Sequence, residues 1–172
     1  MAENLANLIV NDIEKFSKLH SENNAMDISE EDLSHISLEN VDFTNIDFSG
    51  TSFLEANLVN VKFIDCDLSS VDFSRANVTE CDFSGAILNG TSFNYAIVNY
   101  STFSEADMAG CNLSEADLSN SDFSTSENLE SCRFDESTIW PDSDKLPEDF
   151  DCTYNYDLSS LREEDDNQNE TY

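Results

Sequence analysis

Basic residues are scarce in this sequence. Of its 172 residues, 7 are Lys or Arg and 37 are Asp or Glu, so the formal net charge is −30. A chain with this charge is repelled by nucleic acid and by anionic membrane surfaces, and it attracts basic partners. We therefore expect no direct nucleic-acid binding and no membrane binding.

Signals for secretion and for membrane insertion are also missing. The stretch MAENLANLIVNDIEKFSKLH has acidic residues where a signal peptide needs basic ones, and no apolar run approaches about 18 residues. The five cysteines form no CxxC pair and show no metal-ligand spacing. These absences predict a soluble, cytoplasmic protein with reduced cysteines.

The sequence lacks the usual patterns of an active site. It has no phosphate-binding glycine loop and no EF-hand pattern. Neither His20 nor His35 has a Cys or Ser partner implied by the sequence, and no two aspartates stand out as an acid–base pair. We expect no enzyme activity, no catalytic residues, no metal and no cofactor.

A five-residue repeat dominates instead. Every fifth residue from Leu33 to Phe123, the central position, is apolar in all nineteen cases. Two residues earlier, from Ile36 to Ser121, every residue is small or β-branched, and we call this the small position. The residue between them is mostly Asp, Asn, Ser or Thr, and we call it the Asx position. Neither a helix nor an alternating strand produces such a period.

This pattern resembles the pentapeptide-repeat family, whose motif is A(D/N)LXX with Leu or Phe at the centre. Close matches are ANLVN (56–60), CDFSG (81–85) and ADLSN (116–120). The resemblance covers residues 31–140 and implies an all-β solenoid, a right-handed quadrilateral β-helix. Each pentad would form one side, and 110 residues would make about 5.5 coils of twenty residues. Central and small positions would point inward.

The residues themselves support a twenty-residue coil. Central residues twenty apart give one entirely aromatic column of expected core residues, Phe43, Phe63, Phe83, Phe103 and Phe123. Another column has no aromatic residue: Leu38, Leu58, Val78, Val98, Leu118 and, after a shift, Ile139. Like residues pack well when they stack, so a column keeps its size class.

The register slips after Phe123, because Leu129 follows by six residues. We place a one-residue bulge near 124–127. In that register Glu127 and Asn128 fall at small and Asx positions, and an inward Glu127 would be costly.

The ends of a coil stack need covers. Residues 1–30 are predicted to form an N-terminal helical cap, with an amphipathic helix over 3–20. The alternative is a dimerisation or partner helix with an apolar patch around Leu8, Ile9 and Phe16. Residues 141–161 are predicted to form a C-terminal cap, and the stretch 139–151 holds the only Trp and both Pro. The acidic tail, 162–172, should be disordered.

Four cysteines, Cys66, Cys81, Cys111 and Cys132, occupy the small position, where a thiol behaves as a small apolar side chain. Allowing for the bulge, Cys111 and Cys132 stack in successive coils. Neighbouring strands lie about 4.8 Å apart, which is within disulfide reach. We expect free thiols in a reducing cytosol.

The remaining feature is the charge on the rod. Residues 31–140 hold 20 acidic and 3 basic residues, a net charge of −17. About 5.5 coils make a rod roughly 26 Å long. Duplex DNA of that length carries about 15 charges. The resemblance adds that quinolone-resistance, gyrase-protecting family members are understood as DNA mimics.

We therefore predict a DNA mimic that binds a basic DNA-binding protein, such as gyrase or another topoisomerase, a nuclease or a restriction-type factor, and competes with DNA for it. Aspartates at the Asx position also suit corner turns, so their charge has a structural role too. The alternative is an acidic scaffold or protein-interaction module without mimicry, and a homodimer is possible. The candidate binding surface comprises Asp42, Asp47, Asp65, Asp67, Asp82, Glu105, Asp107 and Asp122, among which Asp42, Asp82, Glu105 and Asp122 share one long face.

Overall fold

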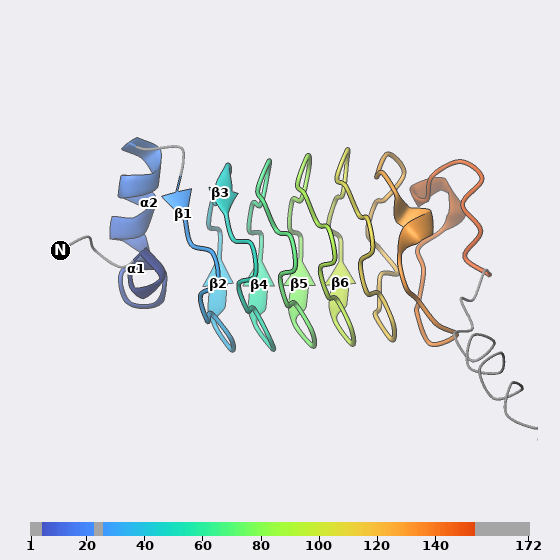
Figure 1. Cartoon of the computed structure of the whole chain (residues 1–172), viewed down its shortest axis with the longest axis horizontal. Coiled ribbons are helices and arrows are strands. Elements are labelled where there is room, and N and C mark those ends of the chain that lie inside the picture. The colour runs from blue at the N-terminus through green and yellow to red at the C-terminus, as the bar shows by residue number, and fades with distance from the viewer. Residues whose placement is uncertain (1–4, 23–25, 154–172) are drawn as a thin grey trace, which may run out of the picture.

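Two short helices and a stack of parallel coils make up the computed structural model, which describes residues 5–22 and 26–153. The elements are α1 (Leu5–Asn11), α2 (Ile13–Glu22), β1 (Met26–Asp27), β2 (Ser37–Glu39), β3 (Ile46–Asp47), β4 (Asn57–Val59), β5 (Asn77–Thr79), β6 (Ile97–Asn99) and the 3-10 helices η1 (Leu129–Ser131) and η2 (Ser143–Lys145). Figure 1 shows the helices at one end of a rod of coils and the last loops at the other.

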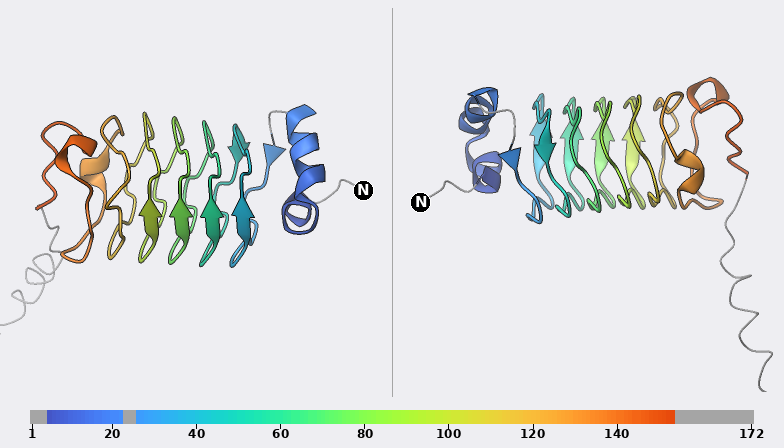
Figure 2. Two further views of the ribbon diagram at one scale, coloured as in Figure 1. Left: turned by 180° about the vertical axis from the view of Figure 1, so that it is seen from behind. Right: turned by 45° about the horizontal axis from the view of Figure 1, so that its top comes forward.

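The strands pair in parallel with partners twenty residues away. Leu38 lies opposite Leu58, Leu58 opposite Val78, and Val78 opposite Val98. Single bridges with the same spacing, such as Asp42 to Lys62 and Asp72 to Ser92, continue the pairing on the other sides. The chain is a right-handed quadrilateral β-helix, as predicted, and its coils are stacked along one axis (Figure 2).

The coils turn because every fifth residue from Glu30 to Glu115, the second after a central residue, adopts positive φ. Asn40, Asn45 and Gly50 have φ of 58°, 63° and 70°. At such a corner the N–H of Ile46 donates to the carbonyl of Phe43 at 3.2 Å, closing a turn of the kind that needs positive φ at its third residue. We call these residues the corner positions.

Four faces follow from the four pentads of each coil, and we name them by their central residues. Face A carries Phe43, Phe63, Phe83, Phe103 and Phe123; face B carries Ile28, Phe48, Leu68, Leu88, Met108 and Leu129; face C carries Leu33, Phe53, Phe73, Phe93, Leu113 and Phe134; face D carries Leu38, Leu58, Val78, Val98 and Leu118. All of these side chains are buried. Face D holds β2, β4, β5 and β6, and faces B and D lie on opposite sides of the coil.

Two phenylalanine stacks fill the core side by side. On face A the rings of Phe83 and Phe103 are 4.8 Å apart and nearly parallel, at 5°. On face C the rings of Phe73 and Phe93 are 5.1 Å apart at 8°. The two stacks meet edge to face, as for Phe83 and Phe93 at 87°. The aromatic column predicted from the sequence therefore has a second, parallel column beside it.

Burial and hydrogen bonding to the preceding coil account for the residue types at the small position. Buried hydroxyls there donate to the carbonyl of a central residue in the preceding coil, as Thr91 does to Leu68 at 2.6 Å and Ser121 to Val98 at 2.8 Å. Cys66 does the same to Phe43 at 3.0 Å. Cys111 and Cys132 sit in neighbouring coils, and all five cysteines are free thiols.

The N-terminal helices cover the first coil. Asp12 divides the expected single helix in two, because it ends α1 and its carboxylate accepts the N–H of Lys15 at 3.1 Å. Phe16 is fully buried and its ring packs on Phe43 at 5.5 Å. The coils begin earlier than residue 31, since Met26 in β1 already pairs with Ile46.

The expectation of an apolar partner patch around Leu8, Ile9 and Phe16 is wrong, because these side chains are 5%, 2% and 0% exposed. Their apolar face packs on the core of the same chain, so it is not available to a second protein.

Two extra residues near the C-terminal end of the rod change the register. The bulge predicted near 124–127 was placed too early, because Glu127 still pairs with Asp107, twenty residues before it, and is exposed at an Asx position. The extra residue is Asn128, which has positive φ and lets Leu129 turn inward. A second extra residue follows Phe134, because Ile139 pairs with Asp117. Ile139 is 53% exposed, so its expected place in the inward column of face D is wrong.

Aromatic residues close the C-terminal end. The ring of Trp140 packs on Phe134 at 5.2 Å and on Phe150 at 5.0 Å. The carbonyl of Lys145 accepts a hydrogen bond from the N–H of Phe123 at 2.8 Å. In the coil before, the N–H of Phe103 donates to a carbonyl of the following coil instead. The last part of the predicted cap, 154–161, and the predicted tail, 162–172, lie outside the described residues.

Candidate partner-binding acidic surface

The aspartates at Asx positions are fixed by their own turns. The carboxylate of Asp82 accepts the backbone N–H of Ser84 at 3.0 Å and its hydroxyl at 2.6 Å. The same backbone bond recurs at Asp42, Asp47, Asp67, Asp72, Asp107, Asp117 and Asp122. Since these aspartates are half-buried or exposed, one residue supports the fold and adds surface charge.

The structure brings the eight candidate acids onto two adjoining faces. Face A carries Asp42, Asp82 and Asp122 at Asx positions, face B carries Asp47, Asp67 and Asp107, and the shared corner carries Asp65 and Glu105. Pairing every twenty residues aligns each set along the rod. The sequence alone does not show that faces A and B adjoin at the corner of Asp65 and Glu105.

Lysines weaken the charge of face A. Lys62 lies in the same column between Asp42 and Asp82, and its Nζ is 3.8 Å from a carboxylate oxygen of Asp42. Lys145 of the C-terminal cap lies near Asp122 and helps to hold the pKa of Asp122 below its ordinary value, after the backbone and hydroxyl hydrogen bonds of Ser124. Asp42, Asp82, Glu105 and Asp122 do share one face, but the three aspartates each stand beside a lysine.

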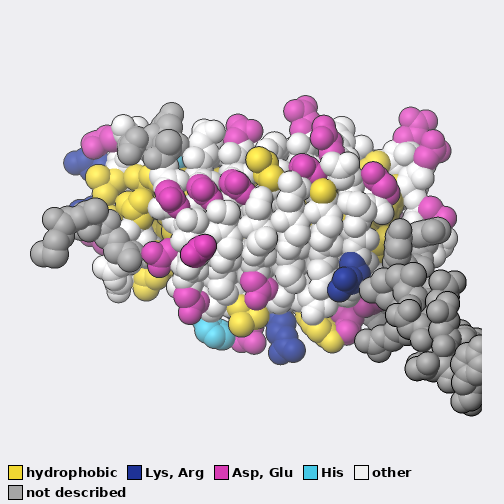
Figure 3. Space-filling view, viewed as in Figure 1, with side chains coloured by type: hydrophobic (Ala, Val, Ile, Leu, Met, Phe, Trp, Pro, Cys, Tyr) yellow, Lys and Arg dark blue, Asp and Glu magenta, His cyan; other side chains and the backbone are white. Residues whose placement is uncertain are grey.

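Face B is the stronger acidic column. Its described Asx positions read Asp27, Asp47, Asp67, Ile87, Asp107 and Glu127, with no Lys or Arg at its outward positions. Asp27 and Glu127 were missed in the sequence, because the first coil was placed too late and Glu127 was expected to point inward. Figure 3 shows acidic side chains in a row along the rod and few basic ones on this side.

Hydrogen bonds favour the ionised form of Asp27, the first carboxylate of face B. The hydroxyl and the backbone N–H of Ser29 lower the pKa of Asp27 below its ordinary value. A lowered pKa favours the charged form, so such a carboxylate carries its full charge at neutral pH.

Charges on the corner between faces C and D are mixed rather than acidic. His35 Nδ1 lies 3.3 Å from Glu55, Arg75 lies 4.0 Å from Glu55, and the guanidinium of Arg75 stands 5.4 Å from the centre of the Tyr95 ring. Glu115, in the next coil, raises the pKa of Tyr95 by hydrogen bonding. These exposed contacts neutralise each other along the rod, so this corner is a poor site for a cationic partner.

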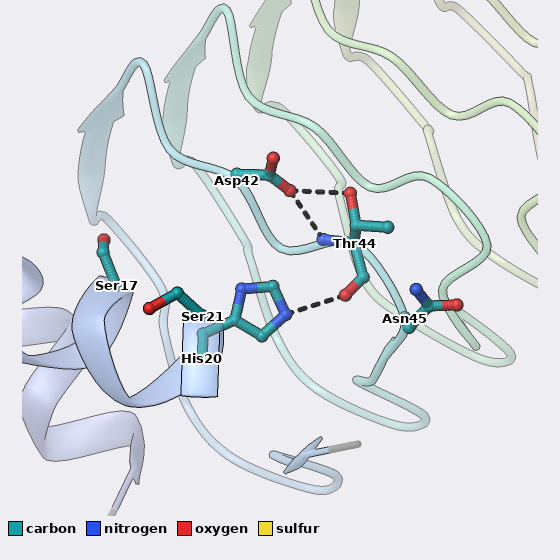
Figure 4. Close-up of a pocket in the computed structure, with 6 residues that line it drawn as sticks. All are labelled: Ser17, His20, Ser21, Asp42, Thr44 and Asn45. Atoms are coloured by element: carbon teal, nitrogen blue, oxygen red, sulfur yellow. Dashed lines mark hydrogen bonds between the residues drawn. The ribbon is translucent and has the colours of Figure 1, made fainter. Parts of the chain in front are cut away.

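A hollow of about 330 Å³ lies between α2 and face A (Figure 4). His20 donates from Nε2 to the carbonyl of Thr44 at 2.8 Å, and Asp42 accepts from Thr44. The hydroxyls of Ser17 and Ser21 donate to helix carbonyls at 2.8 Å and 2.7 Å. Since these polar groups serve local structure, the hollow marks where the helical cap docks and offers no activated nucleophile.

Within residues 5–22 and 26–153, no cluster of His, Cys, Asp and Glu has the geometry to hold a metal ion. Over the same residues, none of the helices has the length and apolar character needed to cross a membrane.

Comparisons with known proteins agree with this geometry. A family model described as a pentapeptide repeat region matches residues 20–93, and one described as pentapeptide repeats in 8 copies matches 86–124. Together these matches cover more than half of the chain. The search of curated proteins returns no match.

Solved structures of repeat proteins are also similar. A pentapeptide repeat protein from the Arabidopsis thaliana thylakoid lumen is 28% identical, with a TM-score of 0.54, over 56% of this chain and 67% of that one. One from the cyanobacterium Cyanothece is 18% identical, with a TM-score of 0.44, over 74% and 99%. QnrB1, a plasmid-mediated fluoroquinolone resistance protein, is 21% identical, with a TM-score of 0.35, over 64% and 67%. The last two likenesses are too weak to bear on function.

Proposed function

The chain belongs to the pentapeptide-repeat family, and on that premise we propose that its acidic faces bind a basic DNA-binding protein in competition with DNA. Proteins of this family are generally non-catalytic scaffold or interaction proteins. Under this proposal the chain has no catalytic role. Its partner class includes gyrase and other topoisomerases, nucleases and restriction-type factors.

The acidic column of face B is the observation that carries the proposal. Asp47 pairs with Asp67 across adjacent coils, and Asp107 pairs with Glu127. Neighbouring coils are about 4.8 Å apart, so these carboxylates form a row along the rod. Phosphates of one DNA strand recur about every 3.4 Å along the helix axis, which is comparable to the rise of the coils along the rod.

Pre-organisation adds to the resemblance between this row and a phosphate backbone. The backbone N–H of Ser49 holds Asp47 at 2.8 Å, and that of Ser69 holds Asp67 at 2.9 Å. Because these aspartate side chains are already ordered, little side-chain entropy is lost when a partner binds them. Basic groups that normally contact phosphates can therefore contact these carboxylates instead.

A cytoplasmic location is part of the proposal. The four buried cysteines and exposed Cys152 are free thiols, as a reducing compartment allows.

Two matched triple variants test the proposal. The test variant is Asp47→Asn, Asp67→Asn and Asp107→Asn on face B; the control is Asp32→Asn, Asp72→Asn and Asp117→Asn on faces C and D. Both remove the same charge from the same turn position. Asn preserves the turn, because the amide oxygen of Asn112 accepts the N–H of Ser114 at 3.2 Å.

The measurement is displacement of labelled duplex DNA from a panel of purified DNA-binding proteins, gyrase included, at several salt concentrations. We expect wild-type protein to displace DNA from at least one member, and the face B variant to lose about tenfold or more in affinity with a flatter salt dependence. The control variant should lose much less.

A scaffold role without mimicry remains the second candidate, favoured by the self-neutralising corner of His35, Glu55 and Arg75. It predicts a partner whose affinity changes neither with salt nor between the two variants. Failure of the wild-type chain to displace DNA from any panel member at low salt would overturn the mimicry proposal.

A further inference from the structure

One coil of this highly charged rod carries no charge. Residues 83–104 contain no Asp, Glu, Lys, Arg or His, although the chain has 44 Asp, Glu, Lys and Arg residues. Twenty residues make a coil, so these residues encircle the rod once. They interrupt the acidic column of face B at Ile87.

Exposed apolar side chains gather on the same coil. The described residues include six large hydrophobic side chains that are exposed, and four of them are Ile87, Tyr95, Ile97 and Tyr100. Ile97 lies on β6 in the middle of face D and is 49% exposed, and Tyr100 lies at its edge and is 66% exposed. Tyr95 lies at the opposite edge, so three of the four side chains form a band across face D.

The fold does not require this band. In the column of Ile97 the other coils carry Ser37, Asn57, Asn77, Asp117 and Ile139, and in the column of Tyr100 they carry Asn40, Asn60, Glu80 and Asn120. The same positions thus accept polar residues in the coils on either side of the band. An apolar band that packing does not demand marks an interaction surface.

The rest of face D is largely uncharged and is rich in amide side chains. Its outward positions from 37 to 120 are uncharged apart from Glu39, Glu80 and Asp117. Amides run along it, with Asn77 donating to Asn57 at 2.7 Å and Asn60 donating to Asn40 at 2.6 Å. An amide both donates and accepts hydrogen bonds, so a row of amides is complementary to a copy of itself.

We propose that two copies of the chain pair through face D, with Ile97 and Tyr100 at the centre of a two-fold interface. A basic partner is drawn to faces A and B, which carry the carboxylates, whereas face D offers it few. A second copy meets few charges at the band, because the coil itself has none and face D adds only Glu80 and Asp117 beside it. A two-fold contact uses one patch twice, which this self-complementary surface allows.

The arrangement leaves the acidic column exposed. Face B lies on the opposite side of the coil from face D, so each copy in the pair keeps Asp47, Asp67 and Asp107 at the outer surface. The pairing goes beyond the proposed function and does not depend on it.

Sedimentation equilibrium of the full chain alone, over a range of concentrations at about 0.02 and 0.5 M salt, tests the pairing. We expect a monomer–dimer equilibrium that strengthens with salt, because salt screens the repulsion between two chains of charge −30. This salt dependence has the opposite sign to that of binding a basic partner, so the two proposals can fail separately.

Variants taken from neighbouring coils identify the surface. Ile97→Asn with Tyr100→Asn copies Asn77 and Asn60, and should weaken dimerisation about tenfold or more, as loss of central interface residues does. Ile97→Asp copies Asp117 and should weaken it further by opposing two carboxylates at the interface. Ile87→Asn, on face B of the same coil, is the control and should leave dimerisation unchanged.

A chain that stays monomeric at every concentration and salt overturns the pairing, and so does a dimer that the face D variants leave intact. If the chain is monomeric while the face D variants lose affinity for a DNA-binding protein, the band serves that partner and the pairing is wrong. Thermal unfolding of each variant confirms that its fold is retained.

Discussion

At the residue scale, each pentad position has its own chemistry. The central side chain fills the core, a Ser, Thr or Cys at the small position bonds to the preceding coil, and the Asx residue holds the turn. Cys81 is an example, because it fits a buried column of Val and Ser and its thiol lies 3.6 Å from the carbonyl of Leu58. Thiols in such surroundings serve packing rather than reactivity.

Thiol reactivity tests this assignment. Burial raises the pKa of Cys66 and of Cys81 to about 12. Thiolates are therefore almost absent at pH 8, and we expect Ellman's reagent to titrate only exposed Cys152 in the native chain and all five thiols in denaturant. Because unfolded thiols ionise near pH 8.5, stability should fall as pH rises above that value. Cys152→Ser is the control and should remove the native signal; rapid reaction of a second thiol would contradict the register.

At the element scale, the stack is stable only when its ends are covered. Phe16 of α2 extends the face A column beyond Phe43, and Trp140 packs over Phe134 at the other end. Each cap thus provides the apolar surface that a further coil would provide. The helices are part of the core of this chain, not a separate binding module.

Replacing Phe16 measures the contribution of the N-terminal cap. Phe16→Ala removes a fully buried ring, and we expect it to lower the free energy of unfolding by about 3 kcal/mol or more. Val10→Ala is the control, since Val10 is 57% exposed and should change stability by less than about 0.5 kcal/mol. Urea unfolding measures both, and a small effect at Phe16 would mean that the helices do not cover the coils.

At the scale of the whole molecule, the aligned carboxylates and the largely uncharged surface lie on different faces of the rod. Faces A and B hold the aligned carboxylates, and face D holds amides and the apolar band of Tyr95, Ile97 and Tyr100. Stacking coils about 4.8 Å apart brings like charges well within one Debye length of about 10 Å at 0.1 M salt. The fold therefore forms against electrostatic repulsion.

Salt should relieve that repulsion. We expect the melting temperature to rise between about 0.02 and 0.5 M sodium chloride, because screening weakens the repulsion along face B. The variant with Asp47→Asn, Asp67→Asn and Asp107→Asn should melt higher at low salt and respond less to added salt. Calorimetry at low protein concentration, where the chain is monomeric, separates this effect from dimerisation. An unchanged melting temperature would contradict it.

Much of the fold could be predicted because the repeat is local. Each pentad encodes its own turn, and the all-phenylalanine column of Phe43 to Phe123 reveals the twenty-residue coil. The register near the C-terminal end could not be predicted in the same way. A six-residue spacing from Phe123 to Leu129 shows that a residue is added but not where, and the positive φ of Asn128 decides that.

The candidate surface was predictable in composition but not in arrangement. Asp42 and Asp47 are both outward-facing acids by sequence, yet Lys62 pairs with Asp42 and no cation lies in the column of Asp47. The helix of Phe16 shows the same limit, since an amphipathic pattern does not say which surface covers its apolar side.

The sequence by itself determined the five-residue turn, the inward columns and the large acidic excess, because these depend on residues close together in the chain. Only the tertiary structure decided which acids share a face, which stand beside a lysine, and where the uncharged coil places Ile97 and Tyr100. Those relations join residues twenty or more positions apart, and stacking of the coils brings them together.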